Sequence, residues 1–246
     1  MKLDLLAFGI HPDDIELSCS GTLLVEKNNG KKVGIIDLSQ GELGTRGTAE
    51  TRKEEAENSA RILGVDVREN LGMADGFFKN DEDNQIKIIK ALRKYRPEII
   101  LCNVIEDRHP DHGRSAQLVN DATFLSGLKK ISTFENDANK LQEPWRPKYV
   151  FNYIQDTYLK PDFVIDISNV FDKKIEAIEA FTTQFYNGTV SDKEPQTYIS
   201  TPEFLESIIN RAKMFGQMIG VKYAEGFLSK KMIGMKSFEA FIQKDT

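Results

Sequence analysis

Cysteine is scarce in this sequence. The chain of 246 residues has two, Cys19 and Cys102, which lie far apart and belong to no metal-binding or redox motif. A secreted scaffold held together by disulfides needs a denser and regularly spaced set. We therefore expect two reduced, partly buried thiols, with a metal or redox role as the alternative.

Long apolar stretches are also missing. The first apolar run, residues 3–10, is too short to span a membrane, and Asp4 interrupts what would be the core of a signal peptide. The sequence therefore predicts no membrane partner and a cytoplasmic location. With 40% hydrophobic and 29% charged residues, it has the composition of an ordinary globular protein. Its length fits a single domain over residues 1–246.

The sequence has no stripe of basic residues. The formal net charge is −5, and the lysines and arginines are scattered along the chain. Proteins that bind nucleic acids usually gather these residues on one face. The pattern argues against a nucleic-acid partner.

Histidine is rare and unevenly placed. The chain has only three histidines, and all of them fall in two short motifs, HPDD at residues 11–14 and HPDH at residues 109–112. Histidines that merely fill a core or a surface would not concentrate in this way. The two motifs are therefore the first candidates for a functional site.

Apolar runs rich in valine, isoleucine and leucine alternate with stretches of helical periodicity. This alternation is typical of a mostly parallel sheet with helices on both faces, so we predict an α/β, Rossmann-like fold. The segments 126–148 and 187–201 look irregular and are candidate active-site loops, with plain surface connections as the alternative. The expected strands are residues 3–10, 32–39, 67–71, 98–104, 149–154 and 163–168, and the expected helices are residues 50–63, 83–95, 170–185 and 203–219.

The two motifs follow the first and the fourth predicted strands. In the common doubly wound order 3-2-1-4-5 these strands are neighbours, and ligands bind beyond their carboxyl ends where the strand order reverses. His11 and His109 are 98 residues apart in the sequence (109 minus 11). The predicted topology nevertheless places them side by side.

The motifs contain a suitable ligand set for a catalytic metal. A catalytic zinc has about three protein ligands and one position open to water. His11 and Asp14 are three residues apart, so both can face inward if a helical turn begins there. With His112 as the third ligand, we predict a Zn²⁺ site, and Fe²⁺ is the alternative metal.

The other polar residues of the motifs suit hydrolysis. Asp13 can act as the general base on a water whose pKa the metal lowers from 15.7 to about 7. His109, as an imidazolium, can stabilise an oxyanion and then protonate a departing amine. Asp111 can hold the tautomer of His109 by accepting a hydrogen bond, and a purely structural carboxylate is the alternative.

A glycine-rich segment, residues 39–48, follows the second predicted strand on the same rim. Its glycines allow a ligand to approach the backbone closely, and its hydroxyl groups and Arg46 suit sugar hydroxyls or carboxylates. A solvated surface loop is the alternative. The GxGxxG spacing of a dinucleotide site is missing after the first strand.

Together these features resemble the LmbE/PIG-L family of zinc-dependent N-acetylglucosaminyl deacetylases. The resemblance rests on the strand before HPDD, the GxxGTRGT loop followed by Arg52 and Glu55, and HPDH after a later strand. It covers essentially the whole chain and implies an LmbE-like deacetylase domain with the ligands, base and acid named above. It also implies that Arg52 contacts the sugar, that a tyrosine, here placed at Tyr198, lies beside the oxyanion, and that the protein tends to form homo-oligomers.

The segment 220–227 further resembles the bacillithiol-biosynthesis branch of the family. That branch hydrolyses N-acetylglucosaminyl-malate to glucosaminyl-malate and acetate, and Arg46, Arg52 and Arg108 are candidates to bind the malate carboxylates. The alternative within the family is another N-acetylglucosamine substrate, such as a chito-oligomer or a thiol conjugate. A non-haem iron(II) oxygenase and a non-enzymatic sugar-binding protein are the alternatives outside it. The presence of both Asp13 and His109 argues against these two.

Overall fold

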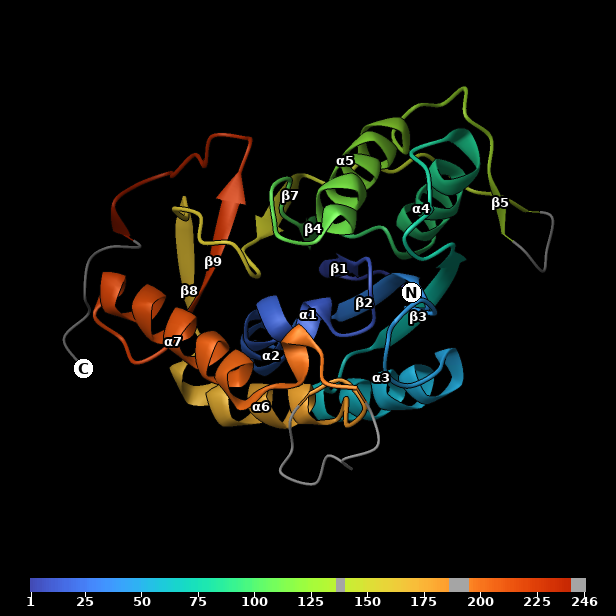
Figure 1. The fold of residues 1–246 in the computed structure, drawn as a ribbon. Coiled ribbons are helices and arrows are strands. Elements are labelled where there is room, and N and C mark those ends of the chain that lie inside the picture. The colour runs from blue at the N-terminus through green and yellow to red at the C-terminus, as the bar shows by residue number, and fades with distance from the viewer. Residues whose placement is uncertain (136–139, 186–194, 240–246) are drawn as a thin grey trace.

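A seven-stranded sheet forms the centre of the computed structural model, which describes residues 1–135, 140–185 and 195–239 (Figure 1). The strand order is β3-β2-β1-β4-β7-β9-β8. Neighbouring strands from β3 to β7 run parallel, and β9 runs antiparallel to both β7 and β8. This confirms the predicted α/β class and the order 3-2-1-4-5. The strands are β1 (Leu5–Gly9), β2 (Val33–Ser39), β3 (Val67–Met73), β4 (Ile99–Asn103), β7 (Tyr149–Tyr153), β8 (Phe163–Asp166) and β9 (Ala224–Ser229), with β5 (Phe134–Glu135) and β6 (Lys140–Leu141) in a separate ribbon.

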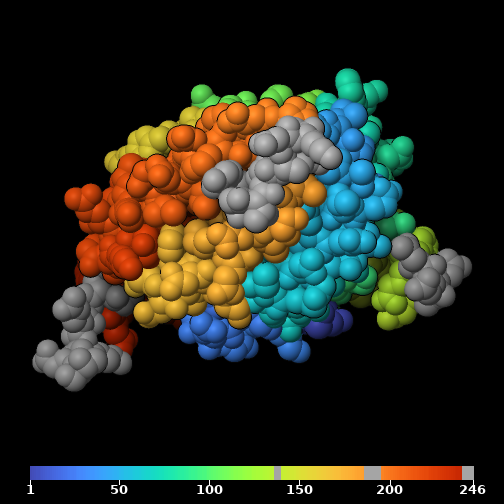
Figure 2. Space-filling view, turned by 60° about the horizontal axis from the view of Figure 1, so that its bottom comes forward, coloured from blue at the N-terminus to red at the C-terminus, as the bar shows by residue number. Residues whose placement is uncertain are grey.

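Helices cover both faces of the sheet. α4 and α5 lie on one face and the other helices lie on the opposite face (Figure 1), where Figure 2 shows α3, α6 and α7. Within the described part of the chain, no helix is both long enough and apolar enough to pass through a membrane. The helices are α1 (Asp14–Ser18), α2 (Ser20–Asn28), α3 (Ala49–Leu63), α4 (Glu82–Tyr95), α5 (Pro110–Leu125), α6 (Phe171–Glu179) and α7 (Pro202–Ile219), with 3-10 turns η1 (Ser168–Val170) and η2 (Tyr198–Ser200).

Strand β1 shows why the central strands are apolar throughout. Leu6 and Phe8 belong to the core beneath α4 and α5, whereas Leu5 and Ala7 belong to the core on the opposite face. Alternate side chains of a strand point to opposite sides of the sheet. Because both sides are covered by helices, all four side chains are buried.

The helix predicted over residues 170–185 ends early. α6 stops at Glu179, and the following residues form turns. The Glu55 carboxylate accepts hydrogen bonds from the Thr183 amide at 2.7 Å and from the Thr182 hydroxyl at 3.1 Å. These bonds hold the chain in a turn where helical periodicity alone would continue it.

The two irregular segments differ in their relation to the motifs. None of the described residues of 126–148 lines the cavity beside the motifs, so the expectation of an active-site loop is not met there. The Arg93 guanidinium donates to the carbonyl oxygens of Ser126 at 3.0 Å and Leu128 at 2.9 Å, which ties this segment to α4. The segment 187–201 reaches the cavity through residues 197–199, and its residues up to 194 lie outside the described part.

Glu225 joins β9 to the helices of one face. Its carboxylate accepts hydrogen bonds from the backbone amides of Gly21 at 2.9 Å and Thr22 at 2.7 Å, at the start of α2, and from Lys174 of α6 at 2.8 Å. Lys174 is 1% exposed and Glu225 is 4% exposed. Removing one member of such a buried pair leaves a charge without compensation.

We expect Lys174→Met to lower the free energy of unfolding by about 3–5 kcal/mol, because the Glu225 charge stays buried without its cation. Urea unfolding followed by circular dichroism measures this change. Lys53→Met, at a side chain that is 77% exposed on α3, is the control and should change the free energy by no more than about 0.5 kcal/mol. An equally small effect for Lys174→Met would contradict the structural role of the pair.

Candidate metal centre and catalytic cavity

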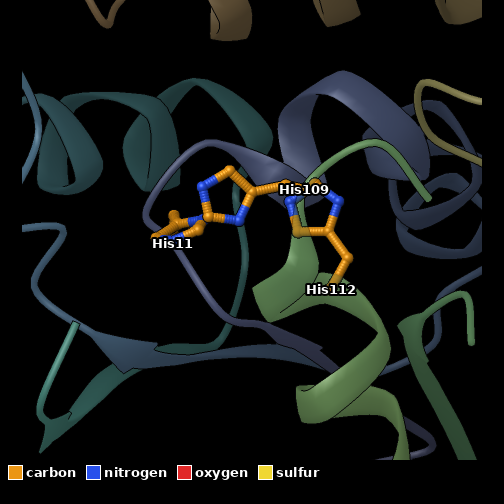
Figure 3. Close-up of side chains that lie close together, drawn as sticks. All are labelled: His11, His109 and His112. Carbon is orange, nitrogen blue, oxygen red and sulfur yellow. The ribbon is translucent and has the colours of Figure 1, made fainter. Parts of the chain in front are cut away.

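The two motifs meet at the carboxyl ends of β1 and β4. These strands pair in parallel, with Leu5 opposite Ile99. His11 follows β1, and His109 is the N-cap of α5, the helix that follows β4. The ring centroids of His11, His109 and His112 lie 4.8, 5.3 and 5.9 Å apart, and Figure 3 shows the three rings clustered together. The structure thus brings the motifs together as the sequence predicts.

Asp14 is the centre of this cluster. Its Oδ1 lies 3.2 Å from Nε2 of His112 and 3.9 Å from Nδ1 of His11. Two ligand atoms that each lie about 2.0–2.1 Å from a tetrahedral zinc are roughly 3.4 Å apart. The two distances from Asp14 are close to this spacing, and the predicted set of three ligands remains a prediction.

Side chains from neighbouring strands fix the Asp14 carboxylate. Oδ2 accepts a hydrogen bond from Asn103 at the end of β4 (3.0 Å), and Oδ1 accepts one from Gln155 just after β7 (2.8 Å). Burial raises the pKa of Asp14, but the neighbouring His112 and His11 outweigh it and hold the pKa well below its ordinary value. Asp14 is therefore ionised, as a metal ligand must be.

Each of the two imidazoles has a second carboxylate partner. Asp75 Oδ1 lies 3.1 Å from Nε2 of His11, and Asp107 Oδ2 lies 2.6 Å from Nδ1 of His112. A histidine that binds a metal through one nitrogen almost always donates its other ring N–H to such a group. Neither Asp75 nor Asp107 is among the predicted site residues. Their placement is independent support for a metal centre.

Donor atoms also gather in two other groups. The ring nitrogens of the three histidines come within 4.8 Å of one another, which makes His109 a further candidate ligand. Donor atoms of His11, Asp75 and Asp111 form the second group. In that group Asp111 accepts the Gly76 amide (3.0 Å) and pairs with an arginine, and Asp75 accepts a backbone amide. We interpret the second group as a hydrogen-bond network.

The carboxylates control the charge of the imidazoles. Burial lowers the pKa of His112, but Asp14 and Asp107 outweigh it and raise the pKa to about 9. Neighbouring carboxylates likewise outweigh burial at His11 and raise its pKa well above the ordinary value. Without a metal, both imidazoles are therefore in the protonated, positively charged form at neutral pH. A divalent cation would satisfy the same carboxylates and release these protons.

Asp13 has an unusual backbone conformation and a fixed partner. Its φ is 137°, which is rare for a residue other than glycine. Arg52 Nη2 donates to Asp13 Oδ2 at 2.8 Å and to the Pro12 carbonyl at 2.5 Å. Burial raises the pKa of Asp13 to about 7, and Arg52 acts in the opposite direction. A carboxyl group with a pKa near neutrality is suited to take up a proton at neutral pH.

His109 and Asp111 do not form the predicted carboxylate–imidazole pair. His109 Nδ1 accepts a hydrogen bond from the backbone amide of Asp111 at 3.2 Å. The Asp111 side chain, in the first turn of α5, turns instead toward the Gly76 amide and lies 3.7 Å from His11 Nε2. Because Nδ1 is an acceptor, a neutral His109 carries its proton on Nε2. Burial and the positive charge of the other two imidazoles lower the pKa of His109.

A cavity of about 450 Å³ opens beside the cluster, within the usual range of small-molecule sites. The glycine-rich loop contributes Leu43, Gly44 and Thr45 to its wall, so this loop reaches the site. Of the predicted site residues only Asp111 is absent from the wall. The predicted residues that line the cavity are His11, Asp13, Asp14, Arg46, Arg52, Arg108, His109, His112 and Tyr198.

Arg108 and Tyr198 share a partner that the sequence analysis does not identify. Asp156 accepts hydrogen bonds from Arg108 Nε at 2.6 Å and from the Tyr198 hydroxyl at 3.1 Å. The Arg108 guanidinium also lies 4.2 Å from the centre of the Tyr198 ring. The Tyr198 hydroxyl is thus hydrogen-bonded to Asp156 at this wall of the cavity, and its role beside the oxyanion remains a prediction. Arg46 lines the same cavity and is buried.

The unpredicted residues Asp75, Asp107 and Asp156 follow strands β3, β4 and β7, respectively. Parallel strands end at the same edge of a sheet, so the rule that places His11 applies to them as well. The chain has 38 acidic residues, however. Only the strand bounds and the sheet order select these three.

Comparison with known proteins is consistent with this site. The family model described as GlcNAc-PI de-N-acetylase (PIG-L) matches residues 6–123, which include both motifs. A conserved protein from Thermus thermophilus, known from a crystal structure, is 35% identical with a TM-score of 0.82. That alignment covers 95% of this chain and 98% of the other.

The names of curated relatives describe two kinds of reaction. The diacetylchitobiose deacetylase of Thermococcus kodakarensis is 29% identical, over 88% of this chain and 79% of the relative. A probable N-acetyl-alpha-D-glucosaminyl L-malate deacetylase of Bacillus anthracis is 24% identical, over 71% of this chain and 78% of the relative. The 4-oxalmesaconate hydratase of Pseudomonas putida is 25% identical over 73% of each chain.

These similarities agree with the geometry of the site. The family match includes both motifs, and the similarity to the Thermus protein extends over nearly the full length of both chains. The chain belongs to the PIG-L/LmbE family of deacetylases, a class of amide hydrolases.

Proposed function

We propose that the protein hydrolyses the acetamide of an N-acetylglucosamine conjugate with the help of bound zinc. The observation that carries this proposal is the cavity wall itself. The donor cluster around Asp14, the carboxyl group of Asp13 and the imidazole of His109 all line one space. A metal site, a base and a hydrogen-bond donor for the oxyanion around one cavity are groups that suit amide hydrolysis.

His11, Asp14 and His112 would hold the metal, with Fe²⁺ as the alternative to Zn²⁺. When bound, such an ion polarises a carbonyl oxygen and makes a water more acidic. The surrounding residues favour a cation. Asp75 lies beside Nε2 of His11 and Asp107 lies beside Nδ1 of His112, so each carboxylate orients one imidazole. The ligand set in this proposal is the one that the motif spacing predicts.

Asp13 would transfer the protons of the reaction, and His109 would stabilise the negative charge that develops. Asp13 takes a proton from the attacking water, whose oxygen forms a bond to the acetamide carbon. His109 donates a hydrogen bond from Nε2 to the oxygen that becomes negative, because its Nδ1 is held as an acceptor by the Asp111 amide. As the carbon–nitrogen bond breaks, the proton that Asp13 took from the water passes to the amine, and acetate and the free amino sugar are released.

Arg52 would serve this reaction through Asp13. Its bonds to Asp13 and to the Pro12 carbonyl hold the base in its strained conformation. The glycine-rich loop would supply hydrogen bonds to the sugar hydroxyls through Thr45 and Arg46, which line the cavity.

The group attached to the sugar is the finer part of the proposal. Arg52 is paired with Asp13 and Arg108 is paired with Asp156, so two of the three arginines proposed for malate already bind carboxylates. This favours an uncharged group attached to the N-acetylglucosamine, such as a second sugar, as in the substrate named for the Thermococcus relative. N-acetylglucosaminyl-malate is the second candidate, supported by the Bacillus relative.

A small substrate panel tests the proposed reaction. We expect amine release from the N-acetylglucosamine dimer to exceed that from free N-acetylglucosamine and from N-acetylglucosaminyl-malate, because the paired arginines leave less charge for malate. A preference for the malate conjugate would support the bacillithiol branch instead. Hydration of 4-oxalmesaconate without amine release from any of the three would contradict the proposal.

Replacing the base tests the role of Asp13. We expect Asp13→Asn to lower kcat by about 10²–10⁴-fold, because general base catalysis contributes on this scale. Zinc affinity should stay within a few-fold, since Asp13 is not a ligand. Asp172→Asn, at an exposed position of α6, is the control and should leave kcat unchanged. Unaltered turnover in Asp13→Asn would remove Asp13 from its proposed role.

The affinity for zinc should rise with pH. The pKa of His112 is about 9 in the metal-free protein, so its ring is protonated below pH 9 and must lose a proton to bind the metal. We expect the association constant to increase about tenfold per pH unit for each proton released between pH 7 and pH 9. Competition with a chelator measures this dependence. An affinity independent of pH would show that His112 is not a ligand.

A further inference from the structure

Asp75 touches parts of the site that are far apart in the sequence. It lies two residues after β3 and is 7% exposed. Its Oδ1 lies 3.1 Å from Nε2 of His11, and its Oδ2 accepts a hydrogen bond from the Leu43 amide at 3.0 Å. Its own amide donates to Glu42 Oε1 at 2.8 Å. One buried carboxylate therefore connects the candidate metal ligand with the glycine-rich loop.

The loop side of this connection belongs to the cavity wall. Leu43, Gly44, Thr45 and Arg46 line the cavity. Glu42 and Leu43 form a reciprocal pair of hydrogen bonds with Asp75, because each segment donates a backbone amide to a carboxylate of the other. Asp75 is thus an anchor for the first part of this loop, at Glu42 and Leu43.

The metal side of the connection fixes the ring of His11. In the neutral ring that would bind a metal, a proton on Nε2 is directed at Asp75 and the lone pair of Nδ1 faces Asp14, whose Oδ1 is 3.9 Å away. Asp111 is the other carboxylate near Nε2 of His11, at 3.7 Å. It is also engaged by the Gly76 amide at 3.0 Å. Asp75 is therefore the group that sets the tautomer and orientation of His11.

We propose that Asp75 is a positioning residue that couples the metal centre to the glycine-rich loop, so that metal binding at His11 orders the substrate-facing backbone of residues 41–47. This inference rests on the proposed metal-dependent function. The physical reason is that a single carboxylate serves two donors. When a metal fixes the His11 ring, Asp75 is fixed with it, and so is the amide of Leu43.

Zinc and hydrogen exchange test the coupling without any sugar substrate. In the wild-type protein, zinc should slow amide exchange in residues 41–47, because the loop opens less often when Asp75 is held. In Asp75→Asn, one of the two donors must face an NH₂ group in place of an oxygen. We expect zinc to bind about 10–100-fold more weakly in this variant, and saturating zinc should no longer slow exchange in the loop.

Asp83→Asn, at an exposed position in the first turn of α4, removes one carboxylate nearby and should behave as the wild type in both measurements. Loop exchange that does not respond to zinc in the wild type would overturn the proposal, even if Asp75→Asn fails to fold. An unchanged zinc affinity in a folded Asp75→Asn would do so as well. Failure of the substrate panel alone would refute the deacetylation and leave this coupling intact.

Discussion

The carboxylate of Asp14 is the interaction on which the site depends. It follows β1, and it accepts hydrogen bonds from Asn103 at the end of β4 and from Gln155 just after β7. Residues at the carboxyl ends of three neighbouring strands thus meet at one carboxylate. The parallel pairing of β1 with β4 and of β4 with β7 determines where this side chain lies, and the histidines of both motifs gather around it. The sheet order therefore determines the geometry of the chemistry.

The site buries several carboxylates, and burying an ionised carboxylate costs free energy because it loses its hydration. Asp13, Asp14, Asp75 and Asp111 are each 7% exposed or less. Ionised carboxylates are stable there only with hydrogen bonds or cations as partners. Protonated imidazoles and Arg52 provide these partners in the metal-free protein, and a divalent ion would take the place of the protons. The same charge balance explains why Arg52 is bound to Asp13.

The sequence predicts those features of the fold and the site that a local pattern of residues determines. The HPDD and HPDH motifs, the apolar strands and the order 3-2-1-4-5 were predicted from residues close in the chain. β9 was not, because it contains the buried charge of Glu225, whose partner Lys174 lies 51 residues away. Asp75 was missed for a similar reason, since its contacts with His11 and Leu43 exist only after the sheet has formed. Side-chain pairing between distant segments is a property of the fold, and spacing does not reveal it.

Crystals of the zinc-loaded protein would show the ion directly through its anomalous scattering. We predict one peak about 2.0–2.2 Å from His11 Nδ1, an oxygen of Asp14 and His112 Nε2. A peak between His11 Nε2 and Asp75, or full activity in protein that contains no metal, would contradict the account.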